Sequence, residues 1–391
     1  MKKILIVGFS LKVGGIERAL VEQLKAIDYN EYQVDLFLFS HFGPYLSDIP
    51  VQVNLLPENC ILKYYGLTQK DAKQSLIGFL VRSCLAVIAK KMGSPWLLTN
   101  LLRSFRLKKE YDIAISYFHN GSLNSLYCGC NELVLDHVDA KRKIAWVHSD
   151  YIVGKICNEY NNRLYKRFDA VVNVSHSMKN KFDRLGIIPK SKSFVVYNRY
   201  DFQGCLQKAS EPIYDEPNGE FNLITIGRLE KEKGIDNLFV IAKSLYEKGL
   251  KFKWYFVGDG VLAPWCIEFI TKNNLRNNVI LMGQRDNPYP YIAQSNMLVS
   301  GSLSETFGLS ILEALTLNIP VIAYKYEAIS ELLNDSNGIV CSSIDEMLNT
   351  ISNLINNQEA YSVLKNRSHA IADYNLISSE QFKNLINEFK C

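Results

Sequence analysis

Two glutamates stand eight positions apart, Glu305 and Glu313, in the segment SETFGLSILEA of residues 304–314. The apolar pattern after Thr306 predicts a helix that begins near Gly308, and the free N–H groups at such a helix start attract a phosphate. Two acids beside a phosphate would repel it unless they bind hydroxyl groups, so the pair indicates a nucleotide sugar. We expect Glu305 to contact the sugar hydroxyls and Glu313 the ribose. One capping acid and one exposed acid explain the same residues.

A second candidate is the glycine-flanked segment IGRLEKEKGIDNL, residues 226–238, which carries Arg228 and Lys233. It follows a predicted strand and leads into a predicted helix. A guanidinium that binds two oxygens at once and an ammonium point charge together suit a diphosphate leaving group. A solvated charge run is the alternative, since Glu230 and Glu232 are interleaved with the basic residues.

The elements that must position these residues alternate between strand and helix. Short β-branched runs bounded by glycine or polar turns are typical of a parallel sheet, with amphipathic stretches between them. Helices are predicted at residues 235–248 and 310–317. Strands are predicted at residues 4–7, 33–39, 113–117, 143–147 and 170–174, and again at 221–226, 253–257, 279–282, 297–300 and 320–323.

The pattern predicts two domains. The chain has 391 residues, more than one hydrophobic core usually supports, and its 48% hydrophobic and 21% charged residues are typical of a globular protein. Proline, glycine, asparagine and charge replace periodicity over residues 196–222, which marks the boundary. We predict an α/β fold with an N-terminal Rossmann-like domain over 1–200, a second over 201–375, and a C-terminal helix over 376–391 that crosses back to the first.

A dehydrogenase is disfavoured. The loop GFSLKVGGIERAL, residues 8–20, opens a helix with Gly14 and Gly15, but its spacing differs from G-x-G-x-x-G. The second predicted strand also ends without the acid that holds the ribose of NAD. A plain tight turn is the alternative for this loop.

The cysteines indicate free thiols. They are nine, an odd number spread along a long chain, which suits a reducing compartment. The pair Cys128 and Cys130 has no second pair or histidine at ligand spacing, so we expect no metal site there.

In sum, the sequence resembles the retaining GT-B glycosyltransferases of family 4, whose signature is E-x7-E, here Glu305 to Glu313. The resemblance covers nearly the whole chain, and the order of its segments carries it. The further matching segments are GGIERA, VSHSMKNKF, GRLEKEKG, FVGDG, MGQRDNPYPYI and PVIAY, at residues 14–19, 174–182, 227–234, 256–260, 282–292 and 320–324.

The resemblance implies two Rossmann-like domains that face each other across a cleft and a role for each matching residue. Glu305 and His148 match residues at the donor sugar, where the catalytic step occurs. His119 is either an acceptor-side residue or a structural one. The matching donor-binding residues are Gly14, Gly15, Arg228, Lys233, Phe307, Gly308, Leu309 and Glu313, and those near the base are Gly283 and Arg285.

The resemblance further implies a retaining, hexosyl-type transfer from a nucleoside-diphosphate sugar, with UDP as the expected nucleotide, to a hydroxyl of a glycan. The acceptor hydroxyl attacks from the front face and the departing phosphate oxygen takes its proton, so no carboxylate base is needed. The sequence contains no D-x-D motif, and we expect neither a metal nor another cofactor, because Arg228, Lys233 and the helix start supply the positive charge.

Charge suggests a membrane partner. Residues 62–109 contain ten basic residues and only Asp71 as an acid, or +9, whereas the whole chain is +4. Interleaved apolar residues predict basic amphipathic helices, which favour anionic lipid headgroups, although ordinary solvated helices explain the same pattern. Stacking aromatics and recognised modules are missing, so no nucleic-acid partner is expected. No uncharged run is long enough for a span.

We therefore expect a cytoplasmic protein, peripheral at the inner face of the cell membrane, that transfers sugar to a lipid-linked glycan in cell-surface polysaccharide synthesis. Two alternatives remain at this stage. One is a nucleotide-sugar epimerase of the same fold, and the other is a catalytically silent glycan-binding relative.

Overall fold

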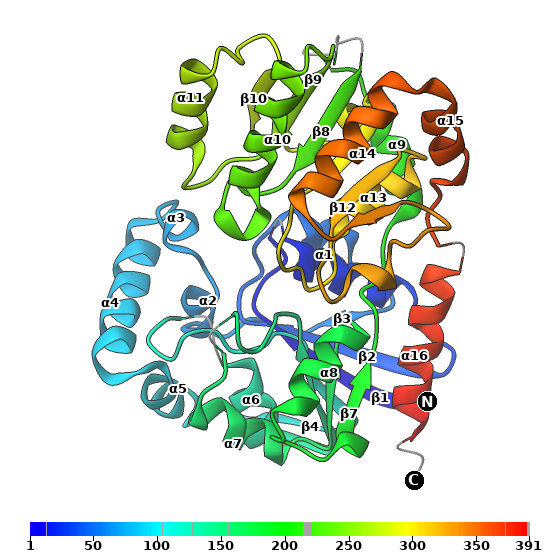
Figure 1. Ribbon diagram of the computed structural model, residues 1–391. Helices are drawn as coiled ribbons and strands as arrows, with labels where there is room; N and C mark the ends of the chain where they lie inside the picture. Colours follow the sequence, from blue (N-terminus) through cyan, green and yellow to red (C-terminus); the bar gives the residue numbers. More distant parts are fainter. Residues whose placement is uncertain are drawn as a thin grey trace. The chain divides into compact units, whose positions relative to one another are not determined.

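A computed structural model of the chain describes residues 1–12, 14–103, 105–126, 129–154, 156–213, 217, 221–371 and 373–388 (Figure 1). The chain divides into two compact units. Unit 1 comprises Met1–Tyr200 together with Asn375–Cys391, and unit 2 comprises Asp201–Tyr374. Each unit has its own hydrophobic core.

Unit 1 is built on a seven-stranded sheet with the strand order β3-β2-β1-β4-β5-β6-β7, and every pairing in it is parallel. Ile4, Leu5, Ile6 and Val7 of the central strand are all buried, as expected for a strand covered on both faces. The strands are β1 (Lys2–Gly8), β2 (Tyr32–Leu38), β3 (Asn54–Leu55), β4 (Leu107–Ser116), β5 (Val138–Val147), β6 (Ala170–Asn173) and β7 (Ser193–Val195).

The helices of unit 1 include one from the far end of the described chain. In α16, Phe382, Leu385 and Ile386 are buried in the core of unit 1, and the ring of Phe382 lies 6.3 Å from that of Trp146. The helices are α1 (Gly15–Lys25), α2 (Leu62–Tyr65), α3 (Gln69–Ala72), α4 (Leu76–Met92), α5 (Ser94–Leu102), α6 (Cys130–His137), α7 (Glu159–Arg167), α8 (His176–Arg184) and α16 (Tyr374–Glu388).

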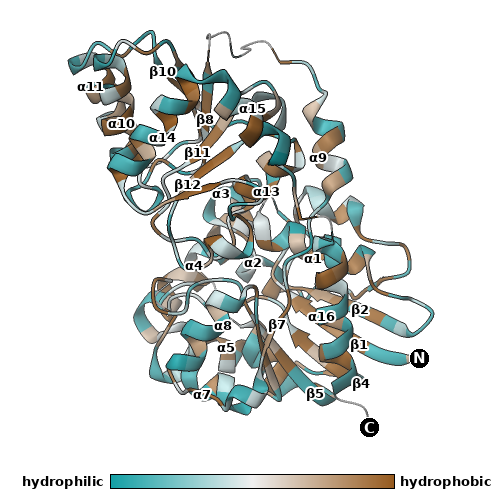
Figure 2. Ribbon diagram, turned by 45° about the vertical axis from the view of Figure 1, so that its right-hand side comes forward, coloured by the Kyte–Doolittle hydropathy of each residue, from teal (hydrophilic) through white to brown (hydrophobic). Residues whose placement is uncertain are grey.

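Unit 2 is likewise built on a parallel sheet, which has six strands in the order β10-β9-β8-β11-β12-β13. Figure 2 shows its strands as hydrophobic, whereas many of the helices have a hydrophobic and a hydrophilic side. The strands are β8 (Asn222–Ile226), β9 (Lys253–Val257), β10 (Val279–Gly283), β11 (Met297–Ser300), β12 (Val321–Tyr324) and β13 (Ile339–Cys341). The helices are α9 (Phe202–Ala209), α10 (Ile235–Glu247), α11 (Ala263–Lys272), α12 (Tyr289–Ala293), α13 (Leu309–Thr316), α14 (Ile344–Asn356) and α15 (Gln358–Arg367).

The predicted α/β class with two Rossmann-like parallel sheets is confirmed. All ten predicted strands are present, although β4 and β5 begin six and five residues earlier than predicted, and α13 begins at Leu309 as expected. Three short strands escaped prediction, β3, β7 and β13. The amphipathic helices expected in the basic segment 62–109 are present as α4 and α5, and Lys108 and Lys109 at the end of the segment lie in β4.

Each sheet has a point where the strand order reverses. In unit 2 the chain runs from β8 outward to β10 on one side and then returns to β11 on the other, and in unit 1 the reversal lies between β1 and β4. Ligands of open α/β sheets bind outside the carboxyl ends of the strands at this position. Candidate residues should therefore be sought in the loops that follow β8 and β11, and those that follow β1 and β4.

Candidate active site

The loops after β8 and β11 of unit 2 contact each other closely at the reversal of the strand order. Gly234 has a φ of 62°, and a Cβ atom there would lie 2.1 Å from the carbonyl oxygen of Gly301. The N–H of Leu303 donates to the carbonyl oxygen of Glu232 at 2.9 Å. Only glycine allows this backbone approach, so the sequence fixes the two loops together at this point.

This approach brings Lys233 and Glu305 together across 72 residues of sequence. The Lys233 ammonium forms an ion pair with Oε1 of Glu305, and Ser302 Oγ donates to the same oxygen at 2.8 Å. Both partners of the ion pair are mostly buried, with 22% and 17% of their side chains exposed. A phosphate bound by Lys233 must therefore share the cation with Glu305.

Arg228 has a different acidic partner. Its Nη1 donates to Oε1 of Glu230 at 2.9 Å, and 67% of its side chain is exposed. The two cations that were predicted as one pair thus have separate carboxylate neighbours, Glu230 for Arg228 and Glu305 for Lys233. Arg228 is the more accessible of the two to a ligand.

The start of α13 lies in the same loop as Glu305. Gly308, with a φ of 93°, precedes the helix, and a Cβ there would lie 2.6 Å from the hydroxyl of Tyr326. That hydroxyl is buried and accepts or donates no hydrogen bond among the described residues. Burial raises the pKa of Tyr326, and the charges of Glu305 and Glu331 raise it further. Phe307 is buried with its ring 5.5 Å from that of Tyr374, so this residue offers a ligand its backbone.

Glu313 lies within α13, and its carboxylate contacts α12. The hydroxyl of Tyr289 on α12 donates to Oε1 of Glu313 at 3.4 Å. Gly283, with a φ of 68°, ends β10, and in the loop that leads into α12 the Arg285 guanidinium lies over the ring of Tyr291, 5.6 Å from its centroid. Helix α12 thus contacts Glu313 through Tyr289 and Arg285 through Tyr291.

His119 and His148 of unit 1 follow the carboxyl ends of β4 and β5 and contact each other. The backbone N–H of His148 donates to Nδ1 of His119 at 3.4 Å, and Nε2 of His148 lies 2.9 Å from the carbonyl oxygen of Tyr117. Burial lowers the pKa of His119 to about 4, and burial followed by the neighbouring His119 lowers that of His148 to about 3. Both imidazoles are therefore neutral near pH 7.

We expect acidification from pH 7 to 5 to destabilise unit 1 through these histidines. Their folded pKa values lie below the ordinary 6.5, so their contribution to stability is complete above about pH 6.5 and is lost as the pH falls toward 4 and 3. The loss is up to about 1.4 kcal/mol per pH unit for each histidine. Urea unfolding at pH 7 and 5 measures it.

In His148→Gln the loss of stability between the two pH values should be smaller by about 2 kcal/mol. His369→Gln, which changes an exposed histidine of unit 2, is the matched control. Glu17 and Glu132 have pKa values raised by burial, and their effect on stability runs in the opposite direction, so the comparison with the variant isolates the histidine. An unchanged pH dependence in His148→Gln would contradict the assignment.

The predicted glycine loop of unit 1 lies beside a pocket. Gly14 caps α1, which starts at Gly15, and the carboxylate of Glu17 occupies the space where a Cβ on Gly14 would lie, 2.1 Å away. Glu17 lines the pocket together with Lys12 and Arg82. The remaining lining residues are Phe9, Tyr65, Gly66, Leu67, Thr68, Gln69, Ser125 and Leu126. The pocket thus combines hydroxyl and amide groups with two cations.

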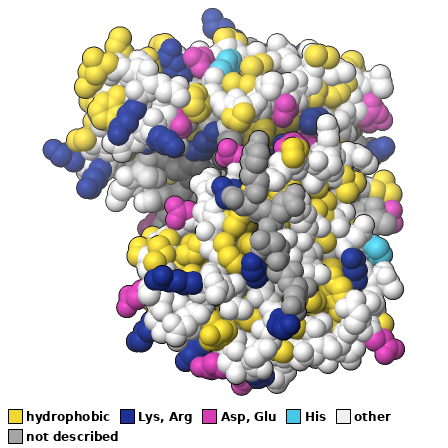
Figure 3. Space-filling model, turned by 90° about the horizontal axis from the view of Figure 1, so that it is seen from above, with side chains coloured by type: hydrophobic (Ala, Val, Ile, Leu, Met, Phe, Trp, Pro, Cys, Tyr) yellow, Lys and Arg dark blue, Asp and Glu magenta, His cyan; other side chains and the backbone are white. Residues whose placement is uncertain are grey.

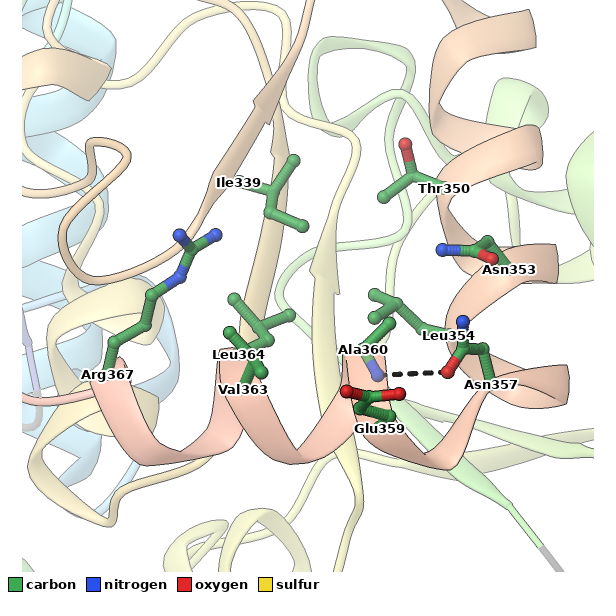
Figure 4. Close-up of a pocket in the computed structure, with 10 residues that line it drawn as sticks. All are labelled: Ile339, Thr350, Asn353, Leu354, Asn357, Glu359, Ala360, Val363, Leu364 and Arg367. Carbon is green, nitrogen blue, oxygen red and sulfur yellow. Dashed lines mark hydrogen bonds between the residues drawn. The ribbon is translucent and has the colours of Figure 1, made fainter.

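A different pocket lies in unit 2, and none of the predicted site residues line it. Figure 4 shows it between β13, α14 and α15, with Arg367 at one end and Asn357 and Glu359 at the other. Asn357 accepts a 3.0 Å hydrogen bond from the N–H of Ala360, which caps α15. This pocket lies beside β13, the edge strand of the sheet, and is therefore separate from the loops after β8 and β11.

Metal ligands are not grouped in the described part of the chain: no three His, Cys, Asp or Glu side chains there are placed to hold an ion. Cys130 is buried, and Cys128, the other cysteine of the pair seen in the sequence, lies outside the described residues.

Sequence reasoning missed three residues of the candidate site. Ser302 and Tyr326 are polar residues just after β11 and β12, so the rule that ligands bind at carboxyl ends of strands provides the signal for both. Tyr289 lies in the segment MGQRDNPYPYI that was already singled out. The contacts that Ser302 makes with Glu305 and Tyr289 makes with Glu313 do not follow from spacing in the sequence.

Comparisons with known proteins concern the family and the fold. Residues 207–370 match the model of the family Glycosyl transferases group 1. The match covers less than half of the chain and lies entirely within unit 2. It includes Arg228, Lys233, Glu305 and Glu313.

Curated relatives extend the likeness. An uncharacterized glycosyltransferase of Methanocaldococcus jannaschii is 34% identical over 266 residues, 63% of this chain and 66% of that protein, just under two thirds of its length. The N-acetylgalactosamine-N,N'-diacetylbacillosaminyl-diphospho-undecaprenol 4-alpha-N-acetylgalactosaminyltransferase of Campylobacter jejuni is 23% identical over 84% of this chain and 82% of its own length.

Solved structures share the fold over both units. The crystal structure of TarM, a protein of S. aureus, has a TM-score of 0.67 with 16% identity and covers 99% of each chain. Anabaena HepE in complex with UDP has a TM-score of 0.60 with 19% identity and covers 99% of this chain and 97% of its own. The predicted GT-B fold class is thereby confirmed.

Proposed function

We propose that this protein is a group 1 glycosyltransferase, which transfers a sugar from a nucleoside-diphosphate sugar to a hydroxyl of a glycan with retention at the anomeric carbon. The observation that carries the proposal is the cluster at the reversal of the strand order in unit 2. There a mostly buried cation, Lys233, a carboxylate, Glu305, and the start of α13 converge. Anions bind at such helix starts, and sugar hydroxyls bind to carboxylates.

In the proposed reaction the bond between the anomeric carbon and the phosphate oxygen breaks while the acceptor oxygen bonds to the same carbon on the same face. The proton of the acceptor hydroxyl moves to the departing phosphate oxygen. Lys233, Arg228 and the N–H groups at the start of α13 stabilise the leaving diphosphate. These groups supply the positive charge, so we propose that no metal or other cofactor is required.

Glu305 and Glu313 have different roles in this proposal. Glu305 binds donor-sugar hydroxyls beside the developing positive charge at the anomeric carbon, and Glu313 with Tyr289 binds the ribose. Tyr326, whose buried hydroxyl lies beside Gly308 and Glu305, is a further group able to bond a phosphate or a sugar. We propose UDP as the nucleotide, which HepE binds in its crystal structure.

For the acceptor we propose a glycan on a lipid, as in the name of the Campylobacter relative. Unit 1 supplies its site, and the pocket lined by Lys12, Glu17 and Arg82 offers both hydroxyl-binding groups and cations for an anionic link. A lipid-linked acceptor would place the protein at the inner face of the cell membrane. Segment 62–109, predicted to contact anionic lipid, includes Arg82 and α4.

A panel of UDP-, GDP- and ADP-sugars tests the proposal by calorimetric binding and by slow hydrolysis without acceptor. We expect one donor to bind and hydrolyse, and Arg228→Ala to weaken its binding about tenfold or more, because an exposed cation that contacts the diphosphate is removed. Arg276→Ala, which removes another exposed arginine of unit 2, should leave binding unchanged.

Two results would contradict the proposal. Failure of every donor to bind would remove the nucleotide sugar as the ligand. Equal effects of Arg228→Ala and Arg276→Ala would remove Arg228 from the site.

A further inference from the structure

Helix α4 of unit 1 presents apolar side chains to solvent. Ile77, Leu80 and Val87 are 66%, 58% and 54% exposed, and Cys84 between them is exposed as well. Their spacing of three, four and three residues places all four on one face of the helix. We call these four residues the α4 stripe.

The opposite face of α4 is also apolar. Gly78, Leu85 and Ala89 are buried against the rest of unit 1, so the helix already has its ordinary core-facing side. Figure 1 shows α4 on the outside of unit 1. Single exposed apolar residues are common, but a continuous exposed stripe marks an interaction surface.

The α4 stripe lies in a region without acidic side chains. From Ala72 to Lys109 the sequence contains no Asp or Glu. Lys73 precedes α4, and Lys90 and Lys91 form its last turn, all three exposed. On the face of the molecule that Figure 3 shows, by contrast, Lys, Arg, Asp and Glu side chains lie interspersed.

We propose that the α4 stripe docks on an anionic lipid bilayer, with the stripe in the headgroup region and the three lysines on lipid phosphates. Basic amphipathic helices bind in this way. A second copy of this chain is the less suitable occupant. In a symmetric contact of two α4 helices the lysines would meet each other, and this stretch of the chain has no acid to pair with them.

The helix lies on the bilayer rather than across it. α4 has 17 residues, and within the described ranges no helix is long and apolar enough to cross a membrane. Met92 and Trp96, 55% and 49% exposed, continue the apolar surface where α4 meets α5. Tryptophan is enriched at the membrane–water interface.

Two cations of the basic segment 62–109 are bonded within unit 1 and are not counted toward the lipid surface. Arg82 Nε donates to the carbonyl oxygen of Leu67 at 2.8 Å, and Lys109 pairs with the buried Asp35 at 2.8 Å. These two cations stabilise unit 1 itself. The proposal is independent of sugar transfer, because it uses none of the donor-site residues.

Flotation with phosphatidylcholine vesicles, with and without phosphatidylglycerol, tests the proposal on the full chain. We expect binding to the anionic vesicles, and Ile77→Ser/Leu80→Ser should lower the partition coefficient at least about tenfold. Lys90→Gln/Lys91→Gln should lower it about tenfold on anionic vesicles and leave it unchanged on neutral ones. Val261→Ser/Ile267→Ser, two apolar residues of unit 2 that are 81% and 59% exposed, is the matched control and should bind as the wild type does.

Sedimentation equilibrium without lipid separates the alternatives. The wild type should be monomeric at the concentrations used for flotation. Lack of flotation with anionic vesicles, an equal loss in the control variant, or a dimer that Ile77→Ser/Leu80→Ser converts to a monomer without changing vesicle binding would each overturn the proposal. Donor hydrolysis should be unaffected by every variant in the series, which shows that each is folded.

Discussion

Replacement of Glu305 by glutamine is expected to lower the rate of sugar transfer about 100-fold or more and to change nucleotide affinity less than about threefold. The carboxylate accepts hydrogen bonds from Ser302 and Lys233 beside the start of α13. Glutamine keeps the shape and the ability to accept a hydrogen bond, but it lacks the negative charge that stabilises a developing positive charge on the donor sugar. Single-turnover kinetics and calorimetry with the nucleoside diphosphate measure the two quantities.

The companion variant Glu313→Gln is expected to show the opposite pattern. Its carboxylate lies beside Tyr289, away from the ion pair, so its loss should weaken nucleotide binding more than it slows turnover at saturating donor. Glu247→Gln on α10, where the glutamate pairs with Lys243 at the surface, is the control and should leave both quantities unchanged. Equal loss of both quantities in both variants would refute the division of roles.

Replacement of Gly234 by alanine is expected to destabilise unit 2 by about 3 kcal/mol or more. The new Cβ would lie 2.1 Å from the carbonyl oxygen of Gly301, a backbone atom that moves only if β11 or its loop moves. The residue also has a left-handed φ of 62°. Chemical unfolding gives the free energy, and hydrogen exchange in β8 and β11 assigns the change to unit 2.

The variant Gly249→Ala separates the two causes of the expected destabilisation, the steric clash of the new Cβ and the strain of a left-handed backbone. Gly249 has a φ of 71° but no atom within 4 Å of a Cβ built on it, so its replacement should cost only the backbone strain, about 1 kcal/mol. Because Gly234 positions Lys233 next to Glu305, its alanine variant should also lose donor binding. Equal destabilisation by the two replacements would show that the loops after β8 and β11 can move apart at no cost in stability.

The strands were predictable because each has a run of buried apolar residues, which is a local property. Lys253–Val257 and Met297–Ser300 have the same bounds in the sequence prediction and in the structure. β13, with only Ile339, Val340 and Cys341, is too short to give such a signal, and it forms because β12 provides a partner. Its existence depends on tertiary contact rather than on its own sequence.

For the candidate site, residue types were predictable and partners were not. Glu305, Gly308 and Glu313 were found from residue types and spacing. That Lys233 pairs with Glu305 whereas Arg228 pairs with Glu230 depends on the contact between Gly234 and Gly301, which no local pattern contains. Likewise, charge counting could not separate Arg82 and Lys109, which are bonded within unit 1, from the exposed lysines of α4.

The return of the chain to unit 1 in α16 has a consequence for synthesis on the ribosome. Unit 2 is inserted between two parts of unit 1, and Asn375 exchanges hydrogen bonds with the backbone of Tyr200 at 3.0 and 2.7 Å, which joins the outgoing and returning segments. A nascent chain emerges from its N-terminus, so all of unit 2 becomes available to fold before Phe382, Leu385 and Ile386 exist to complete the core of unit 1. The half that is made first is therefore the half that is finished last, and until then it exposes the surface that α16 covers.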